Sequence, residues 1–283
     1  MTQKKCYLCD GSDHKKREGK IRNLDGTDVL ECKTCSLVFL SSFAHIDNEF
    51  YQKGEMHLGA AVEKWLEVTK ADDARRFKHL KNKIKDKEIL DFGSGNAGFL
   101  MLAKNSAKDA VGLEIDETLN EHYKQNDISV ITDLKQTDKK FDLITMFHVL
   151  EHLPNPKEIL QEIAPKLKQD GELIIEIPSS EDALITVYKN KGFKNFTYWG
   201  CHLFLFNEKT LQKLFKDSAY KINSIKHVQR YGIANHLHWI LRNQPGGHIA
   251  WKFLDVKFLN KIYETILSFF KITDTIVINV SLK

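Results

Sequence analysis

Three carboxylates in this sequence, Asp91, Glu114 and Asp133, each stand at the end of a short apolar run or just beyond it. If the three runs are successive strands of a parallel sheet, their carboxyl ends meet at one edge, where such sheets bind ligands. Carboxylates at that edge can accept hydrogen bonds from ribose hydroxyls and from the amino group of an adenine. One such acid could be an ordinary loop residue, but three in this arrangement predict a site for an adenosine-containing ligand. Ile115 would offer the adenine an apolar face.

A glycine-rich turn follows Asp91 and leads into the apolar segment 99–103, which favours a helix. Gly93, Ser94 and Gly95 form this turn, and glycines there allow positive φ angles and a close approach of the backbone to a ligand. The new helix would direct its free N–H groups at the same place. Because a carboxylate stands beside the turn, charge favours a cationic or hydroxylated ligand over a pyrophosphate. An ordinary βα turn is the alternative.

Four cysteines near the start of the sequence form two CxxC pairs, Cys6 with Cys9 and Cys32 with Cys35. Each pair can direct two thiolates at one ion, and two pairs complete the tetrahedral site of a structural zinc ion. Residues 1–42 are therefore predicted to be a zinc ribbon, in preference to a rubredoxin-like iron site or to unliganded thiols. A four-thiolate site leaves no open position for catalysis, so we expect the ribbon to shape a substrate cleft. Binding of nucleic acid is the alternative.

The segment around the glycine-rich turn resembles the first motif of the class I methyltransferases that depend on S-adenosyl-L-methionine (SAM). Asp91, Gly93 and Gly95 match that motif, whereas Ala97 stands where a third glycine is usual. The run Leu150–Leu153, with the sequence Leu-Glu-His-Leu, is a second match to the same family. The resemblance implies an α/β fold with a Rossmann-like sheet of seven strands, and it assigns the three acids to a bound SAM.

The same resemblance gives roles to residues near the methyl group and over the cofactor. Phe147 and His148 would lie at the end of a strand, close to the sulfonium of SAM. The predicted helical segment 43–87 would cover the cofactor, and Tyr51 within it would cap the ligand. A packing role for this tyrosine between ribbon and core is equally open.

The elements that must position these residues follow from the apolar runs and the breaks between them. Beyond Asp133 the predicted strands are 141–146, 171–177, 220–228 and 275–281. In the resembling fold the last strand runs antiparallel directly after its predecessor, so residues 229–272 are predicted to be an insertion on the acceptor side. The methyltransferase domain as a whole is expected to span 88–283.

The aromatic stretch 196–206 contains one histidine, His202. A similar histidine occurs in nucleotide-sugar C-methyltransferases that also begin with a zinc ribbon, although an acid usually precedes it and Cys201 does so here. The resemblance makes His202 the first candidate for a catalytic base, with His148 behind it; a histidine packed among aromatics is the alternative. That family has a large C-terminal domain for which this sequence has no room, so we expect transfer to oxygen in preference to carbon.

Polar and aromatic side chains of the insertion are predicted to bind the acceptor. Arginines suit phosphate groups, and aromatic rings suit the face of a sugar. Together with one tyrosine of the aromatic stretch, the candidates are Tyr198, Arg230, Tyr231, Asn235, His236 and His238. The alternative is a lid or dimerisation helix, and the amphipathic run 251–270 would pack on the core or in a homodimer.

The composition limits the function classes. The formal net charge of +4 is small for 283 residues, which argues against a nucleic-acid partner. No apolar stretch reaches the ~20 residues of a membrane span. No signal peptide is recognisable at the start, so we expect a cytoplasmic protein.

We therefore predict a methyltransferase that acts on a small acceptor, namely a sugar or sugar phosphate that could be nucleotide-linked, in surface-polysaccharide biosynthesis. A ribosomal-RNA base methyltransferase that binds RNA through its ribbon is one alternative, supported only by the basic run Lys15–Arg17. A non-catalytic zinc-ribbon binding module is another, against which the three intact acids argue.

Overall fold

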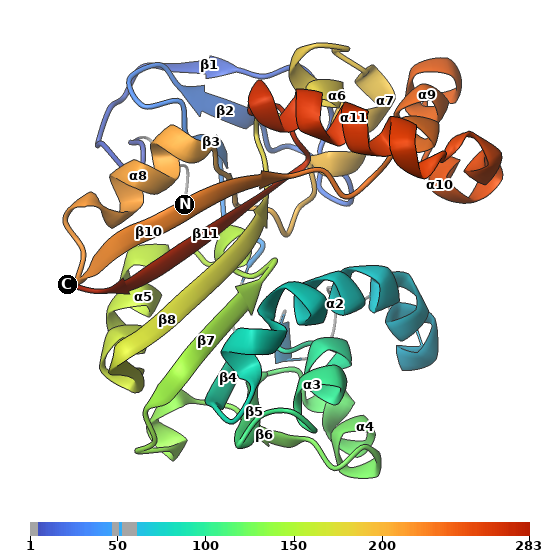
Figure 1. Cartoon of the computed structure of the whole chain (residues 1–283). Coiled ribbons are helices and arrows are strands. Elements are labelled where there is room, and N and C mark those ends of the chain that lie inside the picture. Colours follow the sequence, from blue (N-terminus) through green and yellow to red (C-terminus); the bar gives the residue numbers. More distant parts are fainter. Residues whose placement is uncertain (1–4, 47–50, 53–60) are drawn as a thin grey trace.

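The fold is organised around a seven-stranded sheet in a computed structural model that describes residues 5–46, 51–52 and 61–283. In chain order the strands of this sheet are β4 (Glu88–Phe92), β5 (Asp109–Leu113), β6 (Ser129–Ile131), β7 (Phe141–Phe147), β8 (Leu167–Pro178), β10 (Tyr220–Val228) and β11 (Thr275–Leu282). Across the sheet the order is β10-β11-β8-β7-β4-β5-β6 (Figure 1). β11 runs antiparallel to both neighbours, whereas the remaining adjacent pairs are parallel. The predicted Rossmann-like sheet is confirmed.

Alternate residues of the central strands pack against two layers of helices. Successive side chains of a strand point to opposite faces, and a parallel strand covered on both faces needs apolar residues on both. On β4, Ile89 belongs to one apolar cluster and its neighbour Leu90 to the other. The helices that contribute to these clusters are α2 (Val62–Ile84), α3 (Gly98–Ala103) and α4 (Asn120–Gln125) on the first face, and α5 (Pro156–Ile163) and α8 (Glu208–Lys216) on the second.

The N-terminal residues form a small antiparallel sheet with the order β1-β2-β3-β9. Its strands are β1 (His14–Lys16), β2 (Val29–Cys32), β3 (Val38–Leu40) and β9 (Phe204–Leu205). β9 comes from the aromatic stretch far along the chain, and the sequence did not predict it as a strand. Because β9 pairs with β3, the ribbon and one face of the main sheet share a single apolar cluster.

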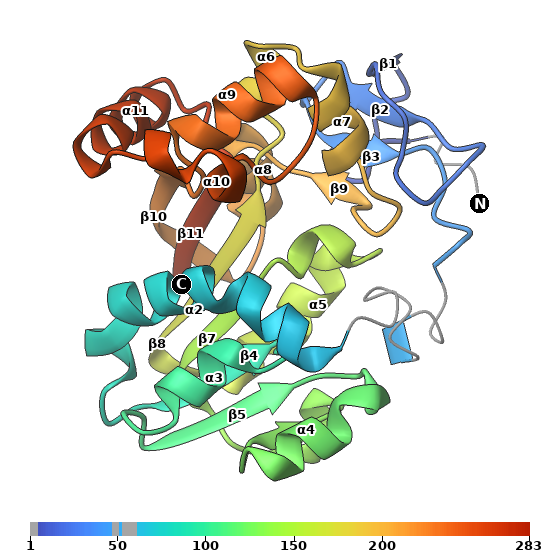
Figure 2. The same cartoon turned by 90° about the vertical axis from the view of Figure 1, so that its right-hand side faces the viewer.

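The residues between β10 and β11 form helices α9 (Ile233–Arg242), α10 (Gly247–Ala250) and α11 (Lys257–Phe269). Two further short helices, α6 (Ala183–Thr186) and α7 (Lys191–Thr197), follow β8. Figures 1 and 2 show these helices together with the ribbon sheet at one end of the molecule, with α2 and α3 below them. The insertion therefore lies at the end of the sheet towards which the parallel strands run.

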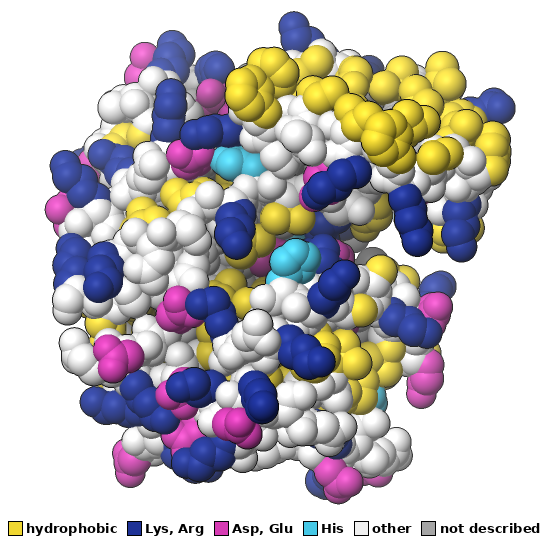
Figure 3. Space-filling model, viewed as in Figure 1, with side chains coloured by type: hydrophobic (Ala, Val, Ile, Leu, Met, Phe, Trp, Pro, Cys, Tyr) yellow, Lys and Arg dark blue, Asp and Glu magenta, His cyan; other side chains and the backbone are white. Residues whose placement is uncertain are grey.

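Helix α11 leaves a broad apolar face exposed, and Figure 3 shows apolar side chains gathered over the insertion. Leu267 is buried, whereas Phe258 and Phe269 are 72% and 79% exposed. The amphipathic run thus packs on the core through one side, and the homodimer stays a prediction. None of the described helices is long and apolar enough to cross a membrane.

Candidate functional site

A cavity of about 900 Å³ opens at the carboxyl ends of the parallel strands. It is lined by every residue that was predicted to hold the cofactor: Tyr51, Asp91, Gly93, Ser94, Gly95, Glu114, Ile115, Asp133 and Phe147. The volume lies within the range of pockets for cofactor-sized ligands. Residues from several strand ends and from the glycine-rich turn therefore face one space.

The glycine-rich turn needs glycine at two positions. Gly93 and Gly95 have φ angles of 72° and 50°, which favour a residue without a side chain. A Cβ atom on Gly93 would lie 2.4 Å from Val149, and one on Gly95 would lie 2.9 Å from the ring of Trp65. Ala97 has a φ of 56° as well, which explains why the resembling family prefers glycine there.

Asp91 lies on β4 at the cavity wall and is almost fully buried. The hydroxyl of Thr145 donates a hydrogen bond of 2.6 Å to its carboxylate. Burial raises the pKa of Asp91 to about 7, although Thr145 and Arg76 act in the opposite direction. A cationic ligand in the cavity would favour the ionised form of this carboxyl group.

Glu114 and Asp133 are oriented by backbone N–H groups. The carboxylate of Glu114 accepts hydrogen bonds of 2.8 Å from Gly95 and from Ile115. Asp133 accepts one of 2.8 Å from Lys135 and thereby caps a short 3-10 turn. Asp133 is therefore held by the loop that follows its strand, and Glu114 by its own loop together with the glycine-rich turn.

Helix α2 belongs to the segment that was predicted to cover the cofactor, and it contributes cavity residues that were not named as candidates. Among them are Trp65, Asp72, Asp73 and Arg76. Arg76 donates a hydrogen bond of 2.8 Å to the buried Glu176 of β8, and its guanidinium lies 4.6 Å from the ring centroid of Phe147. Adjacent charges on a helix usually mark a solvent face, so nothing local signalled that this turn faces the sheet.

Arg230 lines the cavity, where two carboxylates already pair with its charge, and its predicted contact with the acceptor stays a prediction. Its guanidinium lies 3.0 Å from Asp72 of α2 and 3.4 Å from Asp274, directly before β11. Burial lowers the pKa of Arg230, but these carboxylates outweigh burial and raise the value overall. Arg230 thus ties the start of the insertion to α2.

His148 follows β7 and lies between two buried carboxylates. Its Nδ1 lies 3.3 Å from Glu151 Oε1, and its Nε2 lies 3.5 Å from Glu176 Oε1. Burial lowers the pKa of His148, but hydrogen bonds to the two carboxylates raise it overall. Because Nδ1 faces Glu151 and the guanidinium of Arg230 lies 3.3 Å from Nε2, both ring nitrogens already have partners, and this geometry disfavours His148 as the catalytic base.

His202 lines the cavity with a neutral ring. Its Nδ1 donates to the carbonyl of Thr197 at 3.1 Å, so Nε2 carries a free lone pair. The ring packs between those of His152 and Trp199, with centroids 5.1 and 5.3 Å away. Burial lowers the pKa of His202 to about 3. Its Nε2 can accept a hydrogen bond or bind an ion.

Most of the residues predicted to bind the acceptor line the cavity, namely Arg230, Tyr231, Asn235 and His236. Tyr198 and His238 are not among the lining residues, and their predicted contact with the acceptor gains no support here. Tyr198 is buried against the ribbon, next to Gly19. His238 donates to the carbonyl of Gln244 at 2.8 Å and packs edge-on against Trp251, so it fastens α9 to the loop that follows.

Arg22 is a cavity residue from the ribbon that the sequence pattern did not indicate. Its guanidinium carbon lies 4.7 and 4.8 Å from the ring centroids of Phe196 and Trp199. Within the described part of the chain no carboxylate lies at ion-pair distance from it, and its buried Nε has no hydrogen-bond partner. Burial lowers the pKa of Arg22. The ribbon thus adds an uncompensated cation to the cavity wall.

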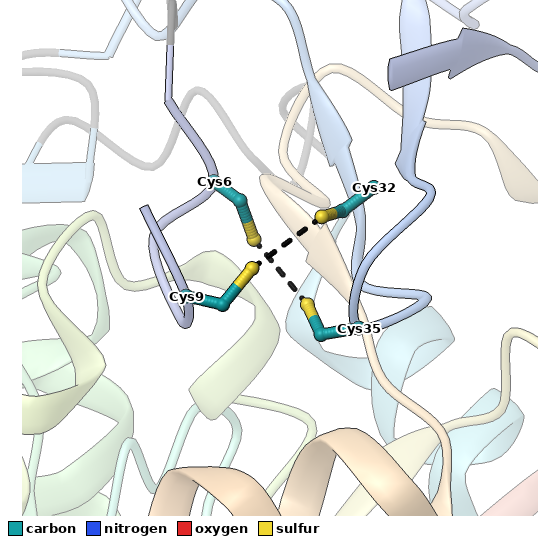
Figure 4. A group of neighbouring side chains, drawn as sticks. All are labelled: Cys6, Cys9, Cys32 and Cys35. Carbon is teal, nitrogen blue, oxygen red and sulfur yellow. Dashed lines mark hydrogen bonds between the residues drawn. The ribbon is translucent and has the colours of Figure 1, made fainter. Parts of the chain in front are cut away.

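The four cysteines of the ribbon converge on one point (Figure 4). Sulfur atoms lie 3.4 Å apart in the pair Cys6 and Cys35 and 3.5 Å apart in the pair Cys9 and Cys32. All four lie within 4.8 Å of one another. Zn–S bonds of about 2.3 Å in a tetrahedron separate the sulfur atoms by about 3.8 Å, so the cluster fits a four-thiolate zinc ion.

The basic run of the ribbon is paired with acids. Lys15 and Arg17 contact Glu31 at 3.0 and 2.7 Å, and Lys16 contacts Asp28 at 2.5 Å. A nucleic acid would have to compete with these carboxylates. The RNA alternative therefore gains no support from the run that had suggested it.

Comparison with known proteins bears on the same region. A family model described as a methyltransferase domain matches residues 65–225, more than half of the chain, and the protein belongs to this family. Ubiquinone biosynthesis O-methyltransferases of Glaesserella parasuis and Coxiella burnetii are 36% and 30% identical over 111 and 140 residues. These matches cover 33% and 44% of this chain and 46% and 53% of the relatives. The chain thus spans about half the length of the curated relatives it matches.

Solved structures resemble the whole fold. A SAM-dependent methyltransferase of Thermotoga maritima, described as a possible histamine N-methyltransferase, has a TM-score of 0.52 at 18% identity over 86% of this chain and 100% of its own. A SAM-dependent methyltransferase of Archaeoglobus fulgidus has the same TM-score and identity over 83% of this chain and 100% of its own. At such low identity the likeness shows the fold alone.

Proposed function

We propose that this protein transfers the methyl group of SAM to a hydroxyl group of a small, anionic acceptor. The observation that carries the proposal is the cavity shared by the acids of three successive strands and the glycine-rich turn. Membership of the methyltransferase-domain family supports it, as do relatives named as O-methyltransferases.

The proposed cofactor contacts follow the strand ends. Glu114 accepts from the ribose hydroxyls, Ile115 and Asp133 contact the adenine, and Asp91 faces the cationic part of the ligand. SAM, when bound, supplies a methyl group that its positive sulfur has already activated. The protein must then align the acceptor with that group and exclude water.

The acceptor is proposed to enter between the ribbon, the aromatic stretch and the insertion. His202 offers Nε2 to the acceptor hydroxyl and helps to remove its proton, because its Nδ1 is fixed on a backbone carbonyl. Asn235, His236 and Tyr231 supply further polar and aromatic groups to the same cavity. The relatives named as O-methyltransferases support O-methylation in preference to C-methylation.

An anionic group on the acceptor would compensate Arg22. A guanidinium without a carboxylate partner favours phosphate, to which it can bind through two parallel hydrogen bonds. A sugar phosphate or a nucleotide-linked sugar has both the hydroxyl and the anion. A place in surface-polysaccharide biosynthesis rests on the resemblance to nucleotide-sugar methyltransferases.

The ribbon is proposed to hold a structural Zn²⁺ through Cys6, Cys9, Cys32 and Cys35. Four thiolates leave no position for a substrate, so the ion would stabilise the ribbon and act on the site only through it. An isolated parallel β-bridge between the backbones of Arg22 and Trp199 connects the ribbon to the aromatic stretch. The zinc site would thereby keep Arg22 in place.

Titration calorimetry of the full chain with SAM tests the cofactor. We expect binding heat for the wild-type chain, and a loss of about 1.5–3 kcal/mol, or roughly 10- to 100-fold in affinity, for Glu114→Ala. Glu117→Ala, an exposed acid outside the cavity, is the matched control. Absence of heat with SAM, or tight binding of a nicotinamide dinucleotide, would contradict the proposal.

Transfer of a radiolabelled methyl group tests the acceptor class. The panel contains free sugars, sugar phosphates, sugar nucleotides and RNA. We expect label in the phosphate-bearing small molecules. Label in RNA alone would overturn the acceptor assignment, and SAM binding without any labelled product would favour the non-catalytic alternative.

A further inference from the structure

Glu151 is a fully buried carboxylate that the proposed reaction does not use. It lies in a 3-10 turn, Leu150–His152, that follows β7. Its Oε1 lies 3.3 Å from His148 Nδ1, whereas its buried Oε2 has no hydrogen-bond partner in the described parts of the structure. A buried carboxylate oxygen without a hydrogen-bond partner lowers the stability of the fold. A ligand that binds this oxygen would explain why it is kept.

Two histidines hold lone pairs beside this carboxylate. Nδ1 of His152 lies 2.8 Å from the carbonyl oxygen of Cys201. Nδ1 of His202 lies 3.1 Å from that of Thr197. A carbonyl oxygen can only accept, so in both rings Nδ1 carries the hydrogen and Nε2 carries a lone pair.

The three potential ligand atoms are close together. Nε2 of His152 lies 4.0 Å from Glu151 Oε1. One ligand atom each from Glu151, His152 and His202 lies within 4.8 Å of the others. Both histidines line the cavity, whereas the carboxylate lies behind them. The group is therefore open to the acceptor on one side and closed on the other.

We propose that Glu151, His152 and His202 bind a divalent transition-metal ion, such as Mn²⁺, Fe²⁺ or Zn²⁺, at the acceptor end of the cavity. Two imidazoles and one carboxylate are a donor set for such ions that leaves open positions for a substrate oxygen. Metal-bound imidazoles commonly donate their other N–H to a carbonyl, as both rings do here. Bonds of about 2.1 Å place ligand atoms at most about 4.2 Å apart, and the pair His152 Nε2 and Glu151 Oε1, at 4.0 Å, already lies within that limit.

The state of the histidines agrees with this geometry. Metal ions require neutral imidazole. Burial lowers the pKa of His152 and lowers that of His202 to about 3. His148 differs, because its ring nitrogens face Glu151 and the guanidinium of Arg230 instead of a carbonyl oxygen.

The role of the ion in the reaction rests on the proposed function, whereas its binding does not. A hydroxyl coordinated to the ion has a lower pKa and loses its proton to water at neutral pH. Its oxygen then bonds to the methyl carbon while the carbon–sulfur bond breaks, with the electron pair staying on sulfur. In this scheme His202 activates the hydroxyl as a ligand of the ion instead of taking the proton itself.

Titration with MnCl₂, followed by electron paramagnetic resonance, tests the site in the full chain after its ribbon has been loaded with stoichiometric zinc. Mn²⁺ favours nitrogen and oxygen ligands over thiolates, so it avoids the ribbon. We expect about one Mn²⁺ per wild-type chain, and more than about 10-fold weaker binding in His152→Ala and in His202→Ala. His248→Ala, which removes an exposed cavity histidine outside the group, should bind Mn²⁺ as the wild type does.

The proposal is overturned if the wild-type chain binds no Mn²⁺, or if both alanine variants retain full affinity. Circular dichroism must show that the variants are folded; His202→Gln replaces His202→Ala if the latter is not. Calorimetry with SAM on the same samples separates the two proposals. Loss of Mn²⁺ binding with normal SAM binding concerns the metal site alone, and Mn²⁺ binding without SAM binding would refute the proposed function and leave the site.

Discussion

The two walls of the cavity are built in different ways. On the cofactor wall most of the predicted residues lie within a few positions of a strand end, as Asp91 does on β4 and Glu114 does after β5, and helix α2 adds others. The acceptor wall combines Arg22 from the ribbon, His202 from the aromatic stretch and Asn235 from the insertion. The cofactor wall is thus specified by local sequence, and the acceptor wall by contacts between distant segments.

The two walls also differ in the partners of their charged side chains. On the cofactor wall Glu114 and Asp133 are oriented by backbone N–H groups of their own loops and, for Glu114, of the glycine-rich turn. On the acceptor wall the two cavity arginines differ, because Arg230 has two carboxylate partners and Arg22 has none among the described residues. Sequence suggested the first as a phosphate ligand, but the free cation is the second.

The strongest test of this contrast is removal of the zinc ion. Structural zinc sites contribute an apparent 10–16 kcal/mol to small domains, so Cys35→Ser should unfold the ribbon and abolish methyl transfer. SAM affinity should change by no more than about twofold, as expected for independent sites. Cys201→Ala, which removes a thiol outside the cluster, is the matched control. Equal loss of SAM binding and activity would contradict the separation of the two walls.

A second test concerns the buried ion pairs between strand β8 and helix α2. Glu176 contacts Arg75 and Arg76 at 2.8 Å, and it is almost fully buried. Glu176→Gln leaves these arginines without their carboxylate and should lower the free energy of unfolding by about 3–5 kcal/mol, measured by urea denaturation. Glu172→Gln, on the more exposed part of the same strand, should cost about 0–1 kcal/mol. Similar values for both variants would show that the buried pairs stabilise little.

A third test addresses Arg22. Arg22→Met keeps the packing on the aromatic rings but removes the charge. It should raise KM for a phosphate-bearing acceptor roughly 10- to 100-fold, which corresponds to a loss of about 1.5–3 kcal/mol of binding free energy. SAM affinity should be unchanged. Tyr198→Phe, at a residue that does not line the cavity, should leave KM unaltered. An unchanged KM in Arg22→Met would mean that the acceptor does not contact this cation.

The smallest expected effect is the pH dependence of SAM binding. Burial raises the pKa of Asp91 to about 7, and a bound cation lowers it again, so binding releases a proton. SAM affinity should therefore increase with pH, by up to about tenfold per unit below pH 7, and level off above. Asp91→Asn should abolish this slope and Asp133→Asn should retain it; an identical slope in both variants would contradict the assignment.

The sign is opposite for the stability of the free protein. The pKa of Asp91 in the fold lies above its ordinary value of 3.8. Its contribution to stability is therefore fully present below pH 3.8 and is lost as the pH rises through about 7. Asp91→Asn should remove this loss, which thermal denaturation of the ligand-free chain at several pH values would detect.

Much of the fold and of the cofactor wall could be predicted because the signals are local. Residues 220–228 were predicted as a strand and form β10, and the predicted strand 275–281 corresponds to β11. The strand β9 could not be predicted, because two residues gain a strand conformation only by pairing with β3. Likewise, which residues of the charged turn of α2 line the cavity depends on how the helix packs on the sheet, so the local sequence did not predict them.

The sequence by itself determined the order of strands along the chain, the glycine-rich turn, the acids after the strands and the four-cysteine cluster. These features follow from apolar periodicity and residue spacing, which act over a few positions. Only the tertiary structure decided which histidine keeps a free lone pair and which arginine keeps its charge. Those properties depend on partners such as Asp72 and Asp274, which lie 158 and 44 positions from Arg230. Pairing and burial of charge are long-range effects, and no local pattern contains them.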